Sequence, residues 1–129
     1  MISNSTRLAR VRSKNTKAEL TVRRMVHWLG IRYRLHDAAL PGCPDMVFAG
    51  RRKVIFVNGC FWHRHRGCAN AQMPRTRTDY WAPKFARTVQ RDEANHMALK
   101  CAGWQVMVVW ECELSDKGKL VERLLEFLT

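Results

Sequence analysis

The sequence predicts an α/β fold in which a mixed β-sheet is flanked by helices, in the order α-β-β-β-α-β-α. Two apolar runs, VIFV and WQVMVVW, have the composition of buried strands. Apolar residues recur at helical spacing in three other segments. No internal repeat or low-complexity linker divides the 129 residues, so we expect one domain, residues 1–129, with residues 1–15 as a basic arm.

The first half of the chain predicts one helix and three strands. Thr16 and Glu19 fit a capping box, in which a hydroxyl and a carboxylate bind exposed amides at a helix start. Gly30 suits the end of this helix. The alternating IRYRL, the short DMVFA after the turn LPGCP, and the apolar VIFV then predict three strands.

The second half predicts a long helix over about residues 80–102, a buried strand and a final helix marked by Leu120, Leu124 and Leu128. The apolar stripe of the long helix contains one acid, Asp92. A carboxylate on a buried face must be paired or metal-bound. An arginine such as Arg87 or Arg91 is the partner in the first case, and a metal ion in the second.

The formal net charge of +12 predicts a polyanionic partner, because nine Lys or Arg and one acid lie between residues 7 and 34. A merely basic, solvated surface is the alternative. No stretch of about 18 apolar residues and no apolar leader occurs, which predicts a soluble, cytoplasmic protein without a membrane anchor. In that reducing compartment, five Cys favour metal binding or buried thiols over disulfides.

Asp45 stands directly after a proline turn, at the start of a predicted strand. It either caps the turn or binds a divalent cation, since Mg²⁺ prefers oxygen ligands. A hairpin would bring Asp45 next to Val57, whose backbone carbonyl would supply a second oxygen ligand. Such a cation activates a water and offsets charge on a phosphate.

The segment VNGCFWHRHRGC combines thiols, imidazoles and aromatic rings. His65 and Cys68 have zinc-ligand spacing, and Cys112 follows a strand that ends nearby; buried thiols are the alternative. We interpret Cys60 as a small core residue. His63 is either a surface histidine or an acid–base group. Phe61, Trp62 and Trp81 are either core aromatics or a platform for stacking on bases.

Several longer motifs carry a resemblance. RYRLHDAALPGCPDMVF followed by VIFVNGCFWHRHRGC, together with RSKNTKAE, TRTDYW and VVWEC, resembles the very-short-patch-repair (Vsr) DNA mismatch endonuclease family of the PD-(D/E)xK superfamily. The resemblance implies a restriction-endonuclease-like three-layer fold with a structural zinc. It also implies Mg²⁺-dependent nicking 5′ to the mispaired T of a T:G mismatch, which arises when 5-methylcytosine deaminates.

The resemblance assigns roles to individual residues. Asp45, His63 and Glu19 match catalytic positions, and Asn58 stands where the family usually has a second catalytic His. An Asn cannot shuttle a proton near neutral pH. The structural zinc would be held by His65, Cys68, Asp92 and Cys112. Residues that match intercalating positions are Phe61, Trp62, Trp81, Leu8 and Val11, and the expected phosphate contacts are Arg7, Arg10, Arg12, Lys14, Arg75 and Arg77.

The expected partner is double-stranded DNA with a T:G mismatch, and the resemblance adds general mismatch-repair proteins. We expect a monomer in the bacterial cytoplasm. Two alternatives remain open from the sequence. One is a related nuclease that cuts another lesion or a specific site, and the other is a zinc-stabilised DNA-binding module inactivated at Asn58.

Overall fold

The computed structural model describes residues 16–129. The predicted order of elements is confirmed, with short 3-10 turns between them. In chain order the elements are α2 (Lys17–Trp28), β1 (Arg34–Leu35), β2 (Met46–Phe48), β3 (Lys53–Asn58), α3 (Thr78–Cys101), β4 (Gln105–Trp110) and α4 (Lys117–Leu128).

The four strands form one mixed sheet in the order β1-β2-β3-β4. β1 pairs antiparallel with β2, and β2 pairs antiparallel with β3. β3 and β4 pair in parallel, with Val57 opposite Val109. Antiparallel neighbours run in opposite directions, so the start of β2 lies beside the end of β3. Asp45 and Val57 therefore meet at one end of the sheet.

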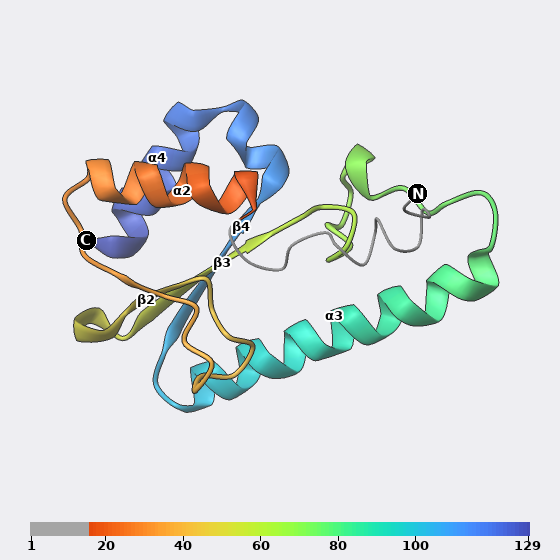
Figure 1. Ribbon diagram of the computed structural model, residues 1–129, viewed down its shortest axis with the longest axis horizontal. Helices are drawn as coiled ribbons and strands as arrows, with labels where there is room; N and C mark the ends of the chain where they lie inside the picture. The colour runs from red at the N-terminus through yellow and green to blue at the C-terminus, as the bar shows by residue number, and fades with distance from the viewer. Residues whose placement is uncertain (1–15) are drawn as a thin grey trace, which may run out of the picture.

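Helices cover both faces of the sheet, which confirms the three-layer α/β fold (Figure 1). On one face, Met46 and Ile55 pack against α2 and α4. The leucines of α4 at positions 120, 124 and 128 are almost fully buried there. On the other face, Phe56 packs against Leu99 of α3. Each such leucine stabilises the fold by about 1.5–3 kcal/mol relative to an exposed one.

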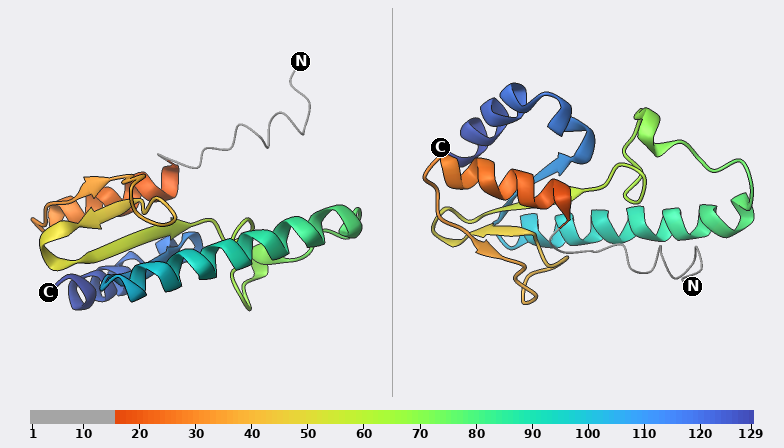
Figure 2. Two further views of the ribbon diagram at one scale, coloured as in Figure 1. Left: turned by 90° about the horizontal axis from the view of Figure 1, so that it is seen from below. Right: turned by 45° about the horizontal axis from the view of Figure 1, so that its top comes forward.

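The first half of α3 extends beyond the sheet, where the segment 59–77 lies alongside it (Figures 1 and 2). Pro83 lies inside α3, past its first turn, so the helix lacks the backbone hydrogen bond that an amide at this position would donate to the carbonyl of Asp79. This overhang brings side chains from three parts of the chain to one end of the sheet. None of the helices within residues 16–129 has both the length and the apolar character needed to cross a membrane.

The start of α2 differs in one respect from the predicted capping box. The Thr16 hydroxyl accepts a hydrogen bond from the Glu19 amide at 3.1 Å, as expected for an N-cap. The carboxylate of Glu19 turns inward, however, and contacts His36 and Arg23. Glu19 is 1 % exposed, so its side chain is buried in the protein interior and does not cap the helix at the surface.

Candidate active site and metal centre

The end of the sheet carries an acidic site formed by Glu19, His36 and Asp45. Asp45 precedes β2, and its carbonyl accepts a hydrogen bond from the His36 amide at 3.2 Å, which closes the loop between β1 and β2. Its Oδ2 atom accepts a hydrogen bond from the Val57 amide at 2.7 Å. Asp45 thus joins the start of β2 to the end of β3, as the hairpin argument predicted.

The three side chains of the acidic site approach one another closely. His36 Nε2 lies 2.7 Å from Glu19 Oε2 and 4.0 Å from Asp45 Oδ1. One ligand atom from each residue falls within 4.8 Å of the other two. Arg23 contacts the same Glu19 oxygen at 3.3 Å and offsets part of its charge.

Sequence reasoning missed His36. The available signal was the hairpin itself, because Arg34 pairs with Val47 and Leu35 with Met46. The next residue along β1 must then face Asp45. His36 has a left-handed backbone with φ of 46°, which is uncommon for a residue other than glycine and marks a position fixed by its surroundings.

The environment of Asp45 disfavours its charged form. Burial raises the pKa of Asp45 to about 7; the Val57 amide works against this rise, and the nearby Glu19 adds to it. His63 is close enough for its charge to lower the pKa of Asp45. A cation bound here would favour the ionised carboxylate in place of the proton.

His63 is held by an acid from the long helix. Its Nδ1 lies 2.7 Å from Asp92 Oδ2, and both side chains are partly exposed. Asn58, at the end of β3, is 5 % exposed. A carboxylate on Nδ1 leaves Nε2 as the ring nitrogen that is directed elsewhere, an arrangement that fixes the tautomer of a histidine.

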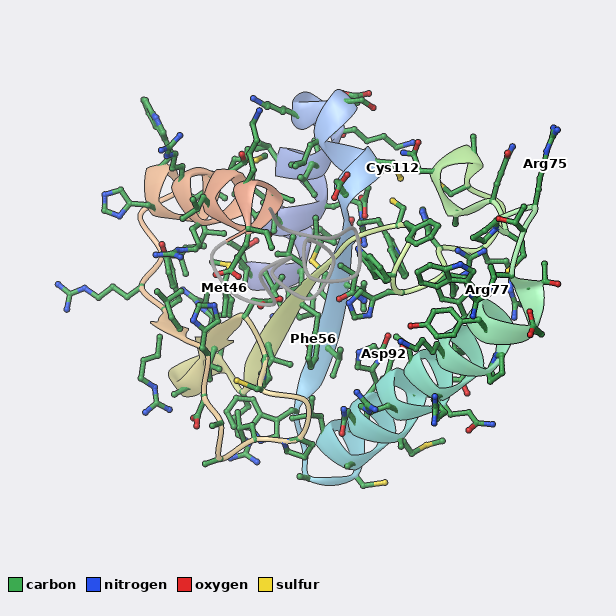
Figure 3. The ribbon with its side chains drawn as sticks, turned by 45° about the vertical axis from the view of Figure 1, so that its right-hand side comes forward. Met46, Phe56, Arg75, Arg77, Asp92 and Cys112 are labelled. Carbon is green, nitrogen blue, oxygen red and sulfur yellow. The ribbon has the colours of Figure 1, made fainter. Side chains whose placement is uncertain are left out.

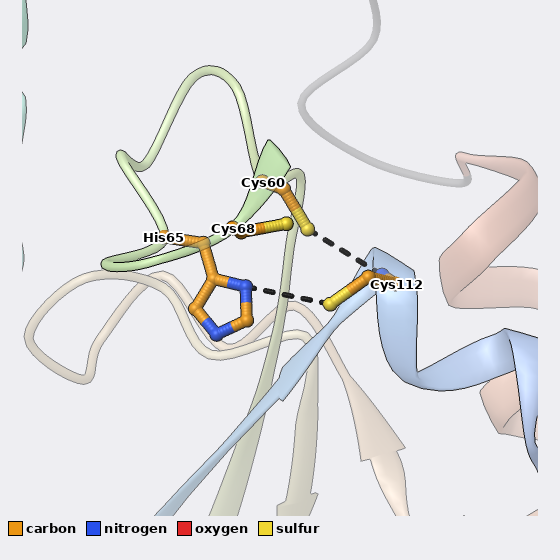
Figure 4. Close-up of side chains that lie close together, drawn as sticks. All are labelled: Cys60, His65, Cys68 and Cys112. Carbon is orange, nitrogen blue, oxygen red and sulfur yellow. Dashed lines mark hydrogen bonds between the residues drawn. The ribbon is translucent and has the colours of Figure 1, made fainter. Parts of the chain in front are cut away.

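The position of Asp92 corrects the expected zinc set. Asp92 does lie on the inner stripe of α3, but its carboxylate pairs with His63. It lies apart from Cys112, one of the cysteines (Figure 3). A different residue, Cys60, completes a thiol–imidazole cluster with His65, Cys68 and Cys112. Cys60 is buried as predicted, but its thiol points to the cluster and not only into the core (Figure 4).

The thiol–imidazole cluster has the composition of a zinc site. Its four ligand atoms lie within 4.8 Å of one another, and zinc prefers four nitrogen and sulfur ligands in tetrahedral geometry. The Cys112 amide approaches Cys60 Sγ at 3.4 Å, and His65 Nδ1 lies 3.4 Å from Cys112 Sγ. The His65 ring stacks on Trp110 with centroids 4.2 Å apart, which fixes its orientation.

The surroundings of the thiol–imidazole cluster shift the pKa values of its thiols in different directions. Burial raises the pKa of Cys60 to about 12 and also raises the pKa of Cys112. The amide of Asn70 lowers the pKa of Cys68. A zinc ion bound here would deprotonate the thiols. Four nitrogen and sulfur ligands fit zinc, and such a closed set is typical of a structural site, since it leaves no position open for substrate. The spacing Cys60-x₄-His65-x₂-Cys68 was the sequence signal for Cys60.

Phe61, Trp62, Trp81 and Phe85 form an aromatic cluster, and Phe61 and Trp62 directly precede His63 in the chain. Phe61 packs edge-on against Trp62 at 5.0 Å and against Phe85 at 5.3 Å, and Trp81 stacks on Phe85 at 5.6 Å. Phe85 is buried, whereas the other three rings are partly exposed. The cluster is therefore anchored in the protein and presents three rings at its surface.

Basic side chains surround the aromatic cluster. Arg75 and Arg77 are exposed in the segment before α3 (Figure 3). A surface hollow of about 290 Å³ beside Trp62 is lined by Lys84, Arg87 and Arg91 of α3. Arg87 and Arg91 thus face this hollow, and Asp92 is paired with His63. Leu8, Val11, Arg7, Arg10, Arg12 and Lys14 lie outside the described residues.

Comparison with known proteins identifies the family. The family model described as DNA mismatch endonuclease Vsr matches residues 3–70. The chain belongs to the Vsr family. It is 37 % identical to the DNA mismatch endonuclease Vsr of Escherichia coli, over 95 % of this chain and 78 % of that protein.

Other relatives of this Vsr-family chain are named type II nicking enzymes. It is 52 % identical to the type II nicking enzyme V.XorIIP of Xanthomonas oryzae, over 94 % of this chain and 88 % of the relative. It is 39 % identical to the type II nicking enzyme V.NmeAIP of Neisseria meningitidis, over 91 % and 83 %. The expected enzyme class, a DNA endonuclease, is confirmed by family membership.

A solved structure supports the fold. The catalytic domain of the homing endonuclease I-Bth0305I superposes with a TM-score of 0.62, covering 88 % of this chain and 94 % of that domain. Its sequence identity is 21 %, so the likeness concerns the fold alone. The Vsr-family chain therefore shares the architecture of a nuclease domain.

Proposed function

We propose that this protein nicks one strand of duplex DNA 5′ to the mispaired T of a T:G mismatch, using Mg²⁺ at the acidic site and zinc as a structural ion. The observation that carries the proposal is the adjacency of three features at one end of the sheet. Phe61 and Trp62 directly precede His63, and His63 in turn lies close to the buried Asp45. This adjacency supports a stacking surface and a hydrolytic site that act on the same stretch of DNA.

Mg²⁺ would be held by Asp45 and the backbone carbonyl of Val57. The Val57 amide donates to Asp45 Oδ2, and the N–H and C=O of one strand residue point to the same edge. The carbonyl is therefore on the Asp45 side of β3. The donor set fits a hard cation, which when bound polarises the phosphate and acidifies water.

His63 would move the proton in the reaction. Asp92 holds its Nδ1, so Nε2 is the atom that accepts a proton from the attacking water or donates one to the leaving oxygen. Asn58 has no group that titrates near neutral pH, so it would orient water or the scissile phosphate by hydrogen bonds. Glu19 would act beside Asp45 in the acidic site, as a second buried carboxylate.

The aromatic cluster would recognise the mismatch by deformation. A mispaired step is easier to unstack than a paired one, and inserted rings exploit that difference. Phe61, Trp62 and Trp81 are the partly exposed members, with Phe85 packed beneath them. We propose that Leu8 and Val11 enter from the other groove.

Phosphate contacts would position the protein without reading sequence. The exposed Arg75 and Arg77 suit this role, as do the hollow beside Trp62 and the basic residues of the arm, Arg7, Arg10, Arg12 and Lys14. Because the substrate would be chromosomal DNA, the protein would act in the cytoplasm of a bacterial cell. We propose that it acts as a monomer. General mismatch-repair proteins would then take over the nicked strand.

The zinc ion would stabilise the segment that carries the aromatic cluster and His63. Its ligands would be Cys60, His65, Cys68 and Cys112, with no position left for substrate. Three of these residues flank His63 within nine positions, and Cys112 follows β4. The ion would thus fix the catalytic loop to the end of the sheet.

The test is a nicking assay on end-labelled duplexes that contain a T:G pair in varied flanking contexts, beside fully paired duplexes. With Mg²⁺ present, we expect a single nick 5′ to the T in mismatched duplex only. Asp45→Asn should abolish the nick while retaining DNA binding, because the amide removes the charged metal ligand and leaves the basic surface intact.

The alternatives predict different results. A site-specific nuclease would cut paired and mismatched duplex of the same sequence equally. A DNA-binding module without chemistry would bind mismatched duplex tightly and nick nothing, and Asp45→Asn would then change nothing. Either result would overturn the proposed function.

A further inference from the structure

The acidic site contains a side chain that an oxygen-ligand magnesium site does not require. His36 lies at the end of β1, and its amide is tied to the carbonyl of Asp45. Its imidazole is 13 % exposed and points at both carboxylates. Nothing in the proposed proton transfer uses it, since His63 already fills that role.

The two oxygens of Asp45 have separate environments. Oδ2 accepts the Val57 amide at 2.7 Å, whereas Oδ1 faces His36 at 4.0 Å. Oδ1 is therefore the oxygen directed at the space between His36 and Glu19. Glu19 directs Oε2 to the same space, where it meets His36 Nε2 at 2.7 Å.

These separations suit ligands of one ion. Ligand atoms at about 2.1 Å from an octahedral cation lie about 3.0 Å apart when adjacent and about 4.2 Å apart when opposite. The observed 2.7 Å and 4.0 Å lie close to those two values. A small outward shift of His36 would exchange its hydrogen bond to Glu19 for a shared ion.

The charges also call for a cation. Glu19 is 1 % exposed and Asp45 is 8 % exposed, and buried carboxylates need compensating positive charge. Arg23 contacts Glu19 on one side. A divalent ion between the carboxylates and the imidazole would compensate both acids at once.

On these grounds, and building on the function proposed above, we infer that His36 is a direct nitrogen ligand of the catalytic cation, which makes the site prefer Mn²⁺ to Mg²⁺. Imidazole suits transition-metal ions better than it suits Mg²⁺, which takes oxygen ligands and keeps its water. Two carboxylates and one imidazole therefore form a site for Mn²⁺ more readily than an all-oxygen site would.

The test measures ligation directly and needs no DNA. Mn²⁺ is added to zinc-loaded protein, and pulsed electron paramagnetic resonance detects nitrogen nuclei bound to it. We expect an imidazole ¹⁴N coupling in the wild-type protein, replaced by the ¹⁵N pattern when histidine is ¹⁵N-labelled. Absence of that coupling in the wild type overturns the inference without any variant.

The variant His36→Gln identifies the ligand. We expect it to lose the nitrogen coupling and to weaken Mn²⁺ binding at least about tenfold, while Mg²⁺ binding, measured by competition, changes much less. His27→Gln, on the exposed side of α2, is the matched control and should behave as the wild type. Coupling that survives in His36→Gln, or equal weakening of both ions, overturns the inference.

The nicking assay separates this inference from the proposed function. Nitrogen coupling without any nick at a T:G pair would leave His36 as a ligand and remove the proposed reaction. A specific nick without nitrogen coupling would leave the reaction and remove His36 from the metal site.

Discussion

The Nδ1 atom of His63 lies 2.7 Å from the carboxylate of Asp92, although 29 residues separate them in the chain. This contact joins the segment between β3 and α3 to the second half of α3. It assigns Asp92 to the orientation of an imidazole, whereas the sequence had suggested a zinc ligand. The two roles lead to opposite expectations for one substitution.

Asp92→Asn should slow nicking while leaving zinc in place. The amide retains the size of the carboxylate but no longer favours the required tautomer of His63, so we expect a rate loss of about 10²-fold or more. Single-turnover nicking and zinc content per chain check this. Glu93→Gln, one residue away and exposed, is the control. Loss of zinc in Asp92→Asn would contradict the assignment.

Cys60→Ser should release zinc and destabilise the protein. Serine oxygen is a poor replacement for a thiolate ligand, so we expect the free energy of unfolding to fall by about 3 kcal/mol or more. Metal analysis and denaturant unfolding check both effects. Cys101→Ser provides the comparison, because Cys101 is exposed and outside the cluster. Full zinc content in Cys60→Ser would refute the ligand set.

Trp62→Ala should reduce mismatch discrimination more than DNA binding. Stacking of one base on an aromatic ring contributes about 1–3 kcal/mol, which corresponds to a loss of about fivefold to 150-fold in the T:G to T:A cleavage ratio. The ratio of nicking rates on the two duplexes is the measurement. Trp28→Ala should leave it unchanged, since Trp28 is 88 % exposed at the end of α2. An unaltered ratio in Trp62→Ala would mean that Trp62 is only a packing residue.

The stability of the protein without added divalent cation should fall as pH rises from 5.5 to 8. The pKa of Asp45 is raised to about 7, above its ordinary value of 3.8, so the folded state holds a proton that the unfolded chain has already lost. The contribution lost over this range is about 2 kcal/mol, since each pKa unit corresponds to about 1.4 kcal/mol.

Asp45→Asn isolates this effect. The variant has no carboxylate to ionise, so its unfolding free energy should lack the part of the pH slope that Asp45 causes. Urea unfolding of both proteins across the pH range gives the difference. Parallel pH profiles for the two proteins would show that Asp45 ionises freely in the folded state.

The sheet and helices were predictable because their apolar patterns are local. The buried VIFV and WQVMVVW became β3 and β4, and the helix stripe of Phe85 and Leu99 packed as expected. Asp45 and Val57 were placed together because a hairpin has only one simple pairing. In each case short-range spacing determined the contact.

The zinc ligand set was harder to predict because it depends on how an irregular segment turns. The segment between β3 and α3 has no regular period, so nothing local indicated whether Cys60 would face the core or the cluster. Asp92 satisfied the rule that a buried acid needs a partner, but the rule does not name that partner. In the fold the partner of Asp92 is His63. His36, with its left-handed backbone, lies in the acidic site.

The thiol–imidazole cluster also alters how the chain is connected. Cys60 and Cys112 lie 52 positions apart, and the interval between them contains all of α3 and β4. An ion that joins them closes a large loop, and closing such a loop removes conformational freedom mainly from the unfolded chain. In topological terms, a bound zinc ion would give the small domain a cross-link without a disulfide, next to the segment that carries the proposed intercalating and catalytic residues.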